Sequence, residues 1–175
     1  MSPSDAALVE AYRAGDQSAA TLLVARHATP LGRFLVSSGV GPDEAEDLVQ
    51  EALFRAFRRI DTWRAEASFR SWLFTIAGNL VKDEYRKRRG RMMVSIEDRD
   101  LADHNDPAAT LDAKDAEERL AAGLTRLPRL QREVFLLRVN GGVEYEEIAA
   151  TLGTTPGAAR VHFHHAVKRL KELVR

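Results

Sequence analysis

The sequence predicts an all-α protein of two small helical domains joined by a flexible acidic linker. Apolar residues recur at helical spacing along most of the 175 residues, and few segments alternate with the period of two that is typical of strands. Residues 92–113 lose this periodicity and carry a net charge of −5, whereas the segments before and after them carry +2 and +3. We therefore expect domains at 1–91 and 114–175, separated by a linker at 92–113.

The first domain is expected to contain four helices, over about 4–14, 16–38, 42–60 and 69–89. Gly15 is a plausible stop for the first helix, and Pro30 is a point where the second bends or breaks. Pro42 suits the first position of the third helix, and acidic residues follow it in the first turn. The segment 61–68 is expected to be a break before the fourth helix.

The second domain is expected to contain helices over about 112–124, 128–139, 144–151 and 155–173. Gly153 provides a tight turn between the last two, and Thr154 or Thr155 can cap the final helix. Ala149 and Ala159 are small enough for the two helices to approach closely. This spacing is typical of a helix-turn-helix unit, although other helical hairpins share it.

On a helical wheel, the final helix has an apolar face and a cationic one. The apolar face is formed by Ala159, Phe163, Ala166, Val167 and Leu170. The opposite face carries Val161, His162, His165, Lys168 and Arg169, with Arg160 and His164 on one flank. A cationic helix of this kind fits the major groove of DNA, where its side chains reach base edges or phosphates. The alternative is an ordinary solvated face.

Two helices of the first domain carry unusual outer faces. In the helix at 42–60, Phe54 lies among charged residues, which suggests a protein-docking face; alternatively, Phe54 packs on a neighbouring helix. In the helix at 69–89, aromatic residues alternate with cations on the side opposite the core stripe. That pattern is typical of single-stranded DNA binding. The alternative is that Trp72 and Phe74 belong to the core.

Enzymatic and metal-binding functions find little support in the sequence. The absence of cysteine excludes thiolate metal sites and cysteine nucleophiles, and no phosphate-binding loop or H-E-x-x-H motif is visible. His162 and His165 could share an ion, but two ligands make a poor site. We expect no catalytic residues, no metal and no cofactor. No membrane span or secretory signal is visible, so we expect a cytoplasmic protein.

Several motifs together resemble those of bacterial sigma factors of the extracytoplasmic function (ECF) type, a branch of the sigma-70 family. The runs D-L-V-Q-E-A-L-F-R-A-F and F-R-S-W-L-F-T-I-A-G-N-L-V-K-D-E-Y-R-K-R-R are similar to sigma region 2. The runs L-P-R-L-Q-R-E-V-F-L-L-R and Y-E-E-I-A-A-T-L-G-T-T-P-G-A-A-R-V are similar to sigma region 4. The resemblance covers nearly the whole chain except the linker.

The resemblance implies a transcription initiation factor that binds core RNA polymerase, through the β′ clamp and the β flap, and recognises promoter DNA. It implies core-polymerase contacts at Asp47, Gln50, Glu51, Phe54 and Arg58. It implies contacts to the melted −10 strand at Trp63, Arg64, Ser68, Trp72, Asn79, Lys82, Arg86, Arg88 and Arg89. It implies −35 contacts at Arg160, Val161, His162, His164, His165, Lys168 and Arg169.

In this family the linker threads the polymerase, and an anti-sigma factor usually holds the protein inactive, often at the inner membrane. This chain departs from the family pattern at His162 and His165, where many members have arginine, and at Val167 and Ala159. The histidines suggest that promoter affinity falls as the pH rises from about 6 to 8. The competing interpretation is a helix-turn-helix regulator that binds duplex DNA without polymerase, but it leaves the docking face and the basic aromatic helix unexplained.

Overall fold

The computed structural model describes residues 2–94 and 116–173, and within these ranges it contains helices and no strand. The elements are α1 (Asp5–Arg13), α2 (Gln17–Ser37), α3 (Pro42–Arg58), the 3-10 turn η1 (Ile60–Thr62), α4 (Phe69–Val94), α5 (Ala116–Thr125), α6 (Arg129–Val139), α7 (Tyr145–Leu152) and α8 (Pro156–Leu173). The all-α prediction is confirmed, and each expected helix is present within a few residues of its expected bounds.

Local capping explains several of the helix starts. Ser4 accepts a hydrogen bond from the Ala7 amide at the start of α1, and Asp16 accepts one from the Ser18 amide at the start of α2. Of the two alternatives at Pro30, a bend or a break, the break is wrong, because α2 continues through Pro30. Pro30 removes one backbone hydrogen bond, and burial of Leu31 and Phe34 in the next turns offsets that loss.

α4 is longer than its sequence pattern predicts. It runs to Val94 and so takes the first three residues of the expected 92–113 linker. The rest of that linker, at 95–113, lies outside the described residues. The helix beyond residue 91 therefore follows a stretch rich in Arg and Lys, which are good helix formers even without an apolar stripe.

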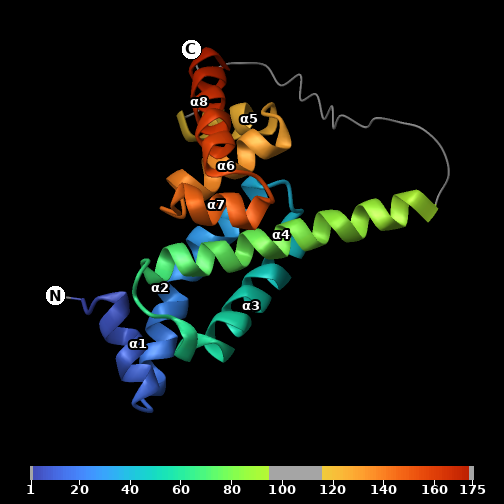
Figure 1. Cartoon of the computed structure of the whole chain (residues 1–175). Helices are drawn as coiled ribbons and strands as arrows, with labels where there is room; N and C mark the ends of the chain where they lie inside the picture. The colour runs from blue at the N-terminus through green and yellow to red at the C-terminus, as the bar shows by residue number, and fades with distance from the viewer. Residues whose placement is uncertain (1, 95–115, 174–175) are drawn as a thin grey trace.

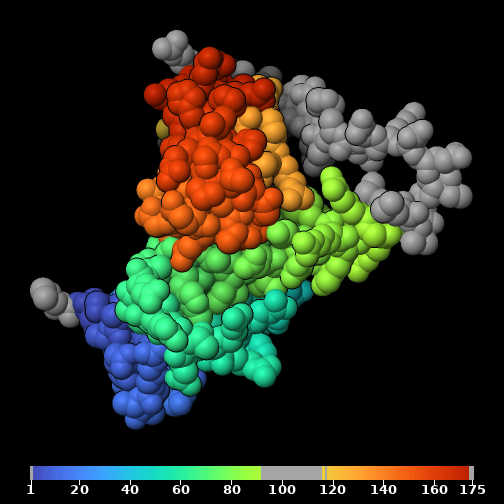
Figure 2. Space-filling view, in the orientation of Figure 1, coloured from blue at the N-terminus to red at the C-terminus, as the bar shows by residue number. Residues whose placement is uncertain are grey.

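α4 is the central element of the molecule. One of its sides packs on α2 and α3, burying Leu73, Ala77 and Leu80. The C-terminal helices α6 and α7 lie across another side of α4 (Figure 1), and Figure 2 shows their surface in direct contact with it. The two halves of the chain thus share one hydrophobic core.

α1 is tied to α2 by one carboxylate. Asp5 binds Arg26 at 2.5 Å through Oδ1 and His27 at 2.8 Å through Oδ2. His27 is buried against the Phe69 ring. Burial lowers the pKa of His27, and the charge of Asp5 opposes this shift without overcoming it.

A second buried ionisable group, Glu133, lies on α6. Its carboxylate is 3.1 Å from Arg129 Nε, yet neither of its oxygens accepts a well-aligned hydrogen bond from any described residue. Burial raises the pKa of Glu133, and the nearby charges of Arg129, Arg132 and Lys82 oppose this shift only in part. Desolvation therefore outweighs the ion pair at this position.

Replacement of Glu133 by Gln should stabilise the protein at pH 8. A raised folded-state pKa means that the folded chain binds more protons than the unfolded chain, so stability is lost as the pH rises through that pKa. We expect a melting temperature about 3 °C higher for Glu133→Gln, the shift that roughly 1 kcal/mol causes in a chain of this size. The gain should shrink as the pH is lowered toward 4.5, the ordinary value for this group.

Glu118→Gln is the matched control, because Glu118 is exposed on α5. Its melting temperature should follow that of the wild type at every pH, as measured by circular dichroism. A lower melting temperature for Glu133→Gln across the whole range would mean that the ion pair with Arg129 is net stabilising.

Candidate functional site

The outer face of α3 carries an apolar ring in a charged setting. Phe54 is 57% exposed, and the Arg58 guanidinium lies 5.6 Å from its ring centre. Asp47 and Gln50 are also exposed, while Glu51 is half-buried and paired with a neighbouring arginine. The alternative that Phe54 packs on another helix is therefore wrong. We call these five residues the docking face.

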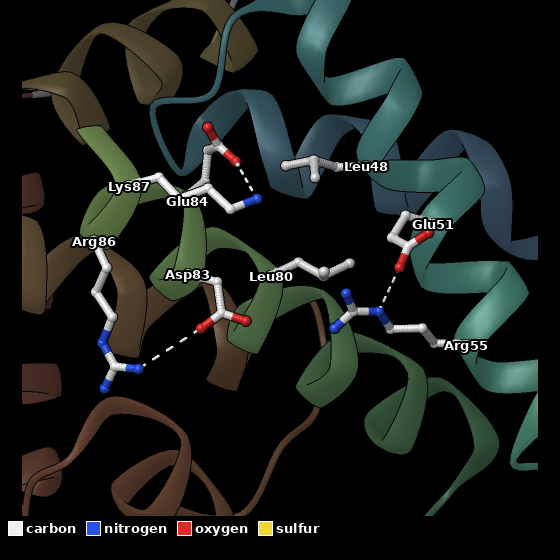
Figure 3. Close-up of a pocket in the computed structure, with 8 residues that line it drawn as sticks. All are labelled: Leu48, Glu51, Arg55, Leu80, Asp83, Glu84, Arg86 and Lys87. Atoms are coloured by element: carbon white, nitrogen blue, oxygen red, sulfur yellow. Dashed lines mark hydrogen bonds and ion pairs between the residues drawn. The ribbon is translucent and has the colours of Figure 1, made fainter. Parts of the chain in front are cut away.

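A groove lies beside the docking face, between α3 and the C-terminal half of α4 (Figure 3). Leu48 and Leu80 contribute its apolar surface, and Glu51 belongs to both the groove and the docking face. Ion pairs occupy its lining: Arg55 with Glu51, Arg86 with Asp83, and Lys87 with Glu84. These internal pairs partly neutralise one another, so the groove is not a strongly charged site.

The segment 61–68 contains the last two residues of η1 and the tight loop that leads to α4. Trp63 is only 6% exposed, and its indole N–H donates to the Ala67 carbonyl at 3.1 Å. Ser68 caps α4 by accepting a hydrogen bond from the Ser71 amide at 3.0 Å. Arg64 is exposed at the loop tip. Trp63 and Ser68 therefore shape the loop in this conformation, and Trp63 is not available to stack on a base.

The side of α4 predicted to face a DNA strand is largely covered. Phe74 is fully buried against Phe34, with ring centres 5.1 Å apart, so the alternative that Phe74 belongs to the core is confirmed and its place on the DNA-facing side is wrong. Ser71 is also buried. A Cβ atom at Gly78 would lie 3.2 Å from a methyl carbon of Leu137, on α6. The covering helices are α6 and α7, which helical periodicity alone could not reveal.

Hydrogen bonds also join α4 to the α6–α7 part of the chain that covers it. Lys82 donates from Nζ to the Thr151 carbonyl at 3.0 Å, in the last turn of α7, where a cation is favoured by the helix dipole. Arg70 donates from Nε to the Asn140 carbonyl at 2.8 Å. Lys82, expected to contact DNA, is thus engaged within the chain in this conformation.

Other residues expected at the −10 strand lie on more accessible parts of α4. Asn79, Arg86 and Arg89 are exposed, and Trp72 is half-buried beside Phe69. Arg88 is occupied in a salt bridge with Glu44 of α3. Of the residues predicted to contact the −10 strand, the structure therefore places only some on an exposed surface.

The helix-turn-helix geometry of α7 and α8 agrees with the sequence prediction. Gly153 ends α7 with a left-handed φ of 68°. Thr155 accepts a hydrogen bond from the Ala158 amide at 3.2 Å, which identifies it, rather than Thr154, as the capping residue. Ala159 is fully buried at the close approach of the helices.

The outward face of α8 is cationic and open. Exposed side chains on it are Arg160, Val161, His164, His165, Lys168 and Arg169. His162 differs, because it is half-buried and its Nδ1 atom is buried with no hydrogen-bond partner among the described residues. The three histidines of V-H-F-H-H therefore do not form one surface.

Tyr145 is a site residue that the sequence analysis missed. Its ring lies between two guanidinium groups, 4.9 Å from that of Arg138 and 5.1 Å from that of Arg160. Glu146 also holds Arg160, at 3.2 Å. Arg160 is thus oriented by α7 before any DNA is present, and only the contact between helices, not local spacing, could have indicated this.

Within residues 2–94 and 116–173, there is no group of three or more His, Cys, Asp or Glu side chains that could hold a metal ion. Among the described helices, none has both the length and the hydropathy of a membrane span.

Comparison with known proteins agrees with this geometry. The Sigma-70 region 2 family matches residues 23–91, and the Sigma-70 region 4 family matches residues 117–170. The ECF RNA polymerase sigma factor EcfG of Rhodopseudomonas palustris is 35% identical over 150 residues, covering 82% of this chain and 78% of that protein. The sigma-E factor of Escherichia coli is 32% identical over 174 residues, covering 93% and 90%.

Two solved structures resemble the whole chain. CnrH, in complex with the cytosolic domain of CnrY, superposes with a TM-score of 0.64 at 28% identity and covers 97% of this chain and 96% of its own. RpoE of Bartonella quintana, in complex with the anti-sigma factor NepR, superposes with a TM-score of 0.62 at 29% identity, covering 88% and 95%. The chain therefore belongs to the ECF branch of the sigma-70 family, and it directs promoter-specific transcription initiation by core RNA polymerase.

Proposed function

We propose that three surfaces of the protein each bind a different part of the initiation complex. The docking face of α3 binds the β′ clamp of core polymerase, the loop at 61–68 with α4 holds the melted −10 strand, and α8 enters the major groove of the −35 element. The observation that carries this assignment is the exposed Phe54 ring on a charged helix. Because exposed aromatic rings are costly to hydrate and are common energetic centres of interfaces, this ring is suited to a protein partner.

The −10 strand is held mainly by exposed groups. Arg64 at the loop tip, together with Arg86 and Arg89 on α4, can neutralise phosphates, and Asn79 can hydrogen-bond a base. Trp63 supports the loop from within the core. No group in this set needs to perform chemistry, and we propose that the protein has no catalytic centre. Melting is then driven by binding unpaired bases more tightly than paired ones.

At the −35 element, Arg160 is the first candidate for reading a base. Its guanidinium is already oriented over the Tyr145 ring, and exchange of its bond to Glu146 for a base would free both nitrogens for bidentate contact with guanine. Lys168 and Arg169 lie further along α8 and are suited to phosphates.

The contact between α4 and α6–α7 has a consequence for this function. Lys82 and the Gly78 surface cannot meet a DNA strand while α7 occupies them. We propose that α6 and α7 must leave α4 before the −10 strand is fully bound. The docking face of α3 is open in the same conformation, so polymerase docking and strand binding can be separated in experiment.

A protein inhibitor is the second partner that we propose. The related RpoE of Bartonella quintana was solved with the anti-sigma factor NepR, and CnrH with the cytosolic domain of CnrY. By analogy, an anti-sigma factor binds this chain, and where that factor is anchored in the inner membrane it would hold the chain there.

The function as a whole can be tested with purified protein, core polymerase and a library of promoter fragments. We expect transcripts that begin at common upstream elements only when the protein is present, and sequencing them identifies its −10 and −35 sequences. Duplex binding with no holoenzyme and no transcript would instead favour a DNA-binding regulator.

Replacement of Phe54 by Ser should weaken binding to core polymerase by about tenfold or more, because exposed aromatic anchors often contribute 2 kcal/mol or more to an interface. The melting temperature should stay unchanged, since the ring adds little to the core. Leu22→Ser is the matched control, because Leu22 is a 48% exposed apolar residue on α2. Affinity can be measured by fluorescence anisotropy, and equal effects of the two changes would contradict the assigned docking face.

We call the conformation in which α6 and α7 cover α4 the closed conformation. A disulfide between positions 78 and 151 should hold the chain in it. A Cβ atom at position 78 would lie 3.3 Å from Thr151 Cγ2, and the natural chain has no cysteine to compete. We expect the Gly78→Cys, Thr151→Cys variant to oxidise readily when free, and still to bind core polymerase. Run-off transcription from a selected promoter should fall at least about tenfold and return when a reductant is added.

Each single-cysteine variant serves as a control in both redox states. Full transcription by the oxidised double variant would show that strand binding does not require separation of α7 from α4.

A further inference from the structure

Arg13, in the last turn of α1, contacts a segment far along the chain. Its Nη2 atom donates to the Ile60 carbonyl at 2.5 Å and to the Trp63 carbonyl at 2.7 Å. Its Nη1 atom donates to Glu10 at 2.5 Å, which holds the guanidinium on its own helix. The two carbonyls belong to the first residue of η1 and to the residue that directly follows η1.

The rest of that loop is held at two further points. The Trp63 indole is bonded to the Ala67 carbonyl, and Ser68 is bonded to the first turn of α4. Within this loop, Ala65 has a φ of 59°, a left-handed conformation that is strained for a residue other than glycine. Such a conformation persists only where its surroundings determine it, and Arg13 holds the loop at its N-terminal end.

We infer that Arg13 is a positioning residue for −10 recognition: its Nη2 group, which donates to both carbonyls, fixes the loop at 61–68 in the shape that receives the unpaired strand. The inference rests on the proposed role of this loop. Holding the N-terminal end of the loop before binding removes part of the entropy cost of binding, so the strand is captured more tightly. Arg is suited to this task because Nη2 can donate to both carbonyls while Nη1 stays bonded to Glu10.

A purely structural role for Arg13 is the competing explanation, and Arg26 provides the means to separate the two. The side chains of Arg13 and Arg26 are 24% and 33% exposed, and each makes three hydrogen bonds. Those of Arg26 go to Asp5, Ser2 and Pro3, at the opposite end of α1 from the loop. Loss of Arg26 should therefore loosen α1 without disturbing the loop.

The experiment compares Arg13→Gln, Arg13→Lys and Arg26→Gln in the full chain with core polymerase. The probes are a promoter selected with the wild-type protein, the same promoter with a substituted −10 element, and a template whose −10 segment is premelted. Thermal unfolding and holoenzyme formation are measured in parallel. We expect both Gln variants to lose similar thermal stability and to form holoenzyme normally.

On the selected promoter, transcription by Arg13→Gln should fall about tenfold, which corresponds to the loss of one hydrogen bond to a charged donor. Arg26→Gln should stay within about twofold of the wild type. The number of transcripts from the selected −10 element divided by the number from the substituted element should decrease toward one only for Arg13→Gln. This decrease should occur on the premelted template as well as on the duplex. Arg13→Lys should recover part of the loss, because it keeps the charge without the fork.

Equal losses in Arg13→Gln and Arg26→Gln, or an unchanged −10 ratio in Arg13→Gln, would overturn the positioning role and leave Arg13 as a stabilising residue only. If the wild-type protein itself supports no promoter-specific transcript, the proposed function fails instead. The two failures are therefore distinguishable in the same set of reactions.

Discussion

The structure depends on α4, a helix that is buried on two sides by two different halves of the chain. One side packs on α2 and α3, and the other receives α6 and α7. Gly78 makes the second contact possible, because any side chain there would meet Leu137 and Thr151. Glycine within a helix costs roughly 1 kcal/mol relative to alanine, and here close packing of α6 and α7 accompanies that cost.

The same helix supplies the groups that the proposed function assigns to DNA. Lys82 is one of them, and a phosphate would suit its ammonium group as well as the Thr151 carbonyl that it now contacts. Contact with the carbonyl of α7 and contact with a phosphate exclude each other. The contact of α4 with α6 and α7 therefore does more than bury apolar surface, because it occupies a cation that could otherwise bind the DNA strand.

Much of the fold was predictable because its signals are local. The acidic first turn after Pro42, the glycine turn at Gly153 and the threonine cap of α8 each depend on residues within one or two turns. The exposure of Phe54 was likewise predicted from its own helix, because no neighbouring helix covers that face. In these places, periodicity and capping chemistry agree with the tertiary structure.

The features that the sequence did not predict depend on contacts between distant segments. Phe74 lies on the polar side of a helical wheel but is buried, because Phe34 packs against it and α6–α7 cover the same side of α4. Arg13 meets carbonyls that are 47 and 50 residues away. A helical wheel assigns one inner face to each helix, and it fails where a helix is enclosed from two directions.

The nature of the contact between the halves indicates which ligand can open it. A ligand shifts a conformational equilibrium only through its differential affinity for the two states. The docking face is exposed while α7 covers α4, so docking through α3 alone does not favour the open state. A single strand that needs Lys82 and the surface at Gly78 binds the open state only. Under the proposed function, binding of the promoter strand therefore favours separation of the halves, whereas docking of the β′ clamp on α3 alone does not.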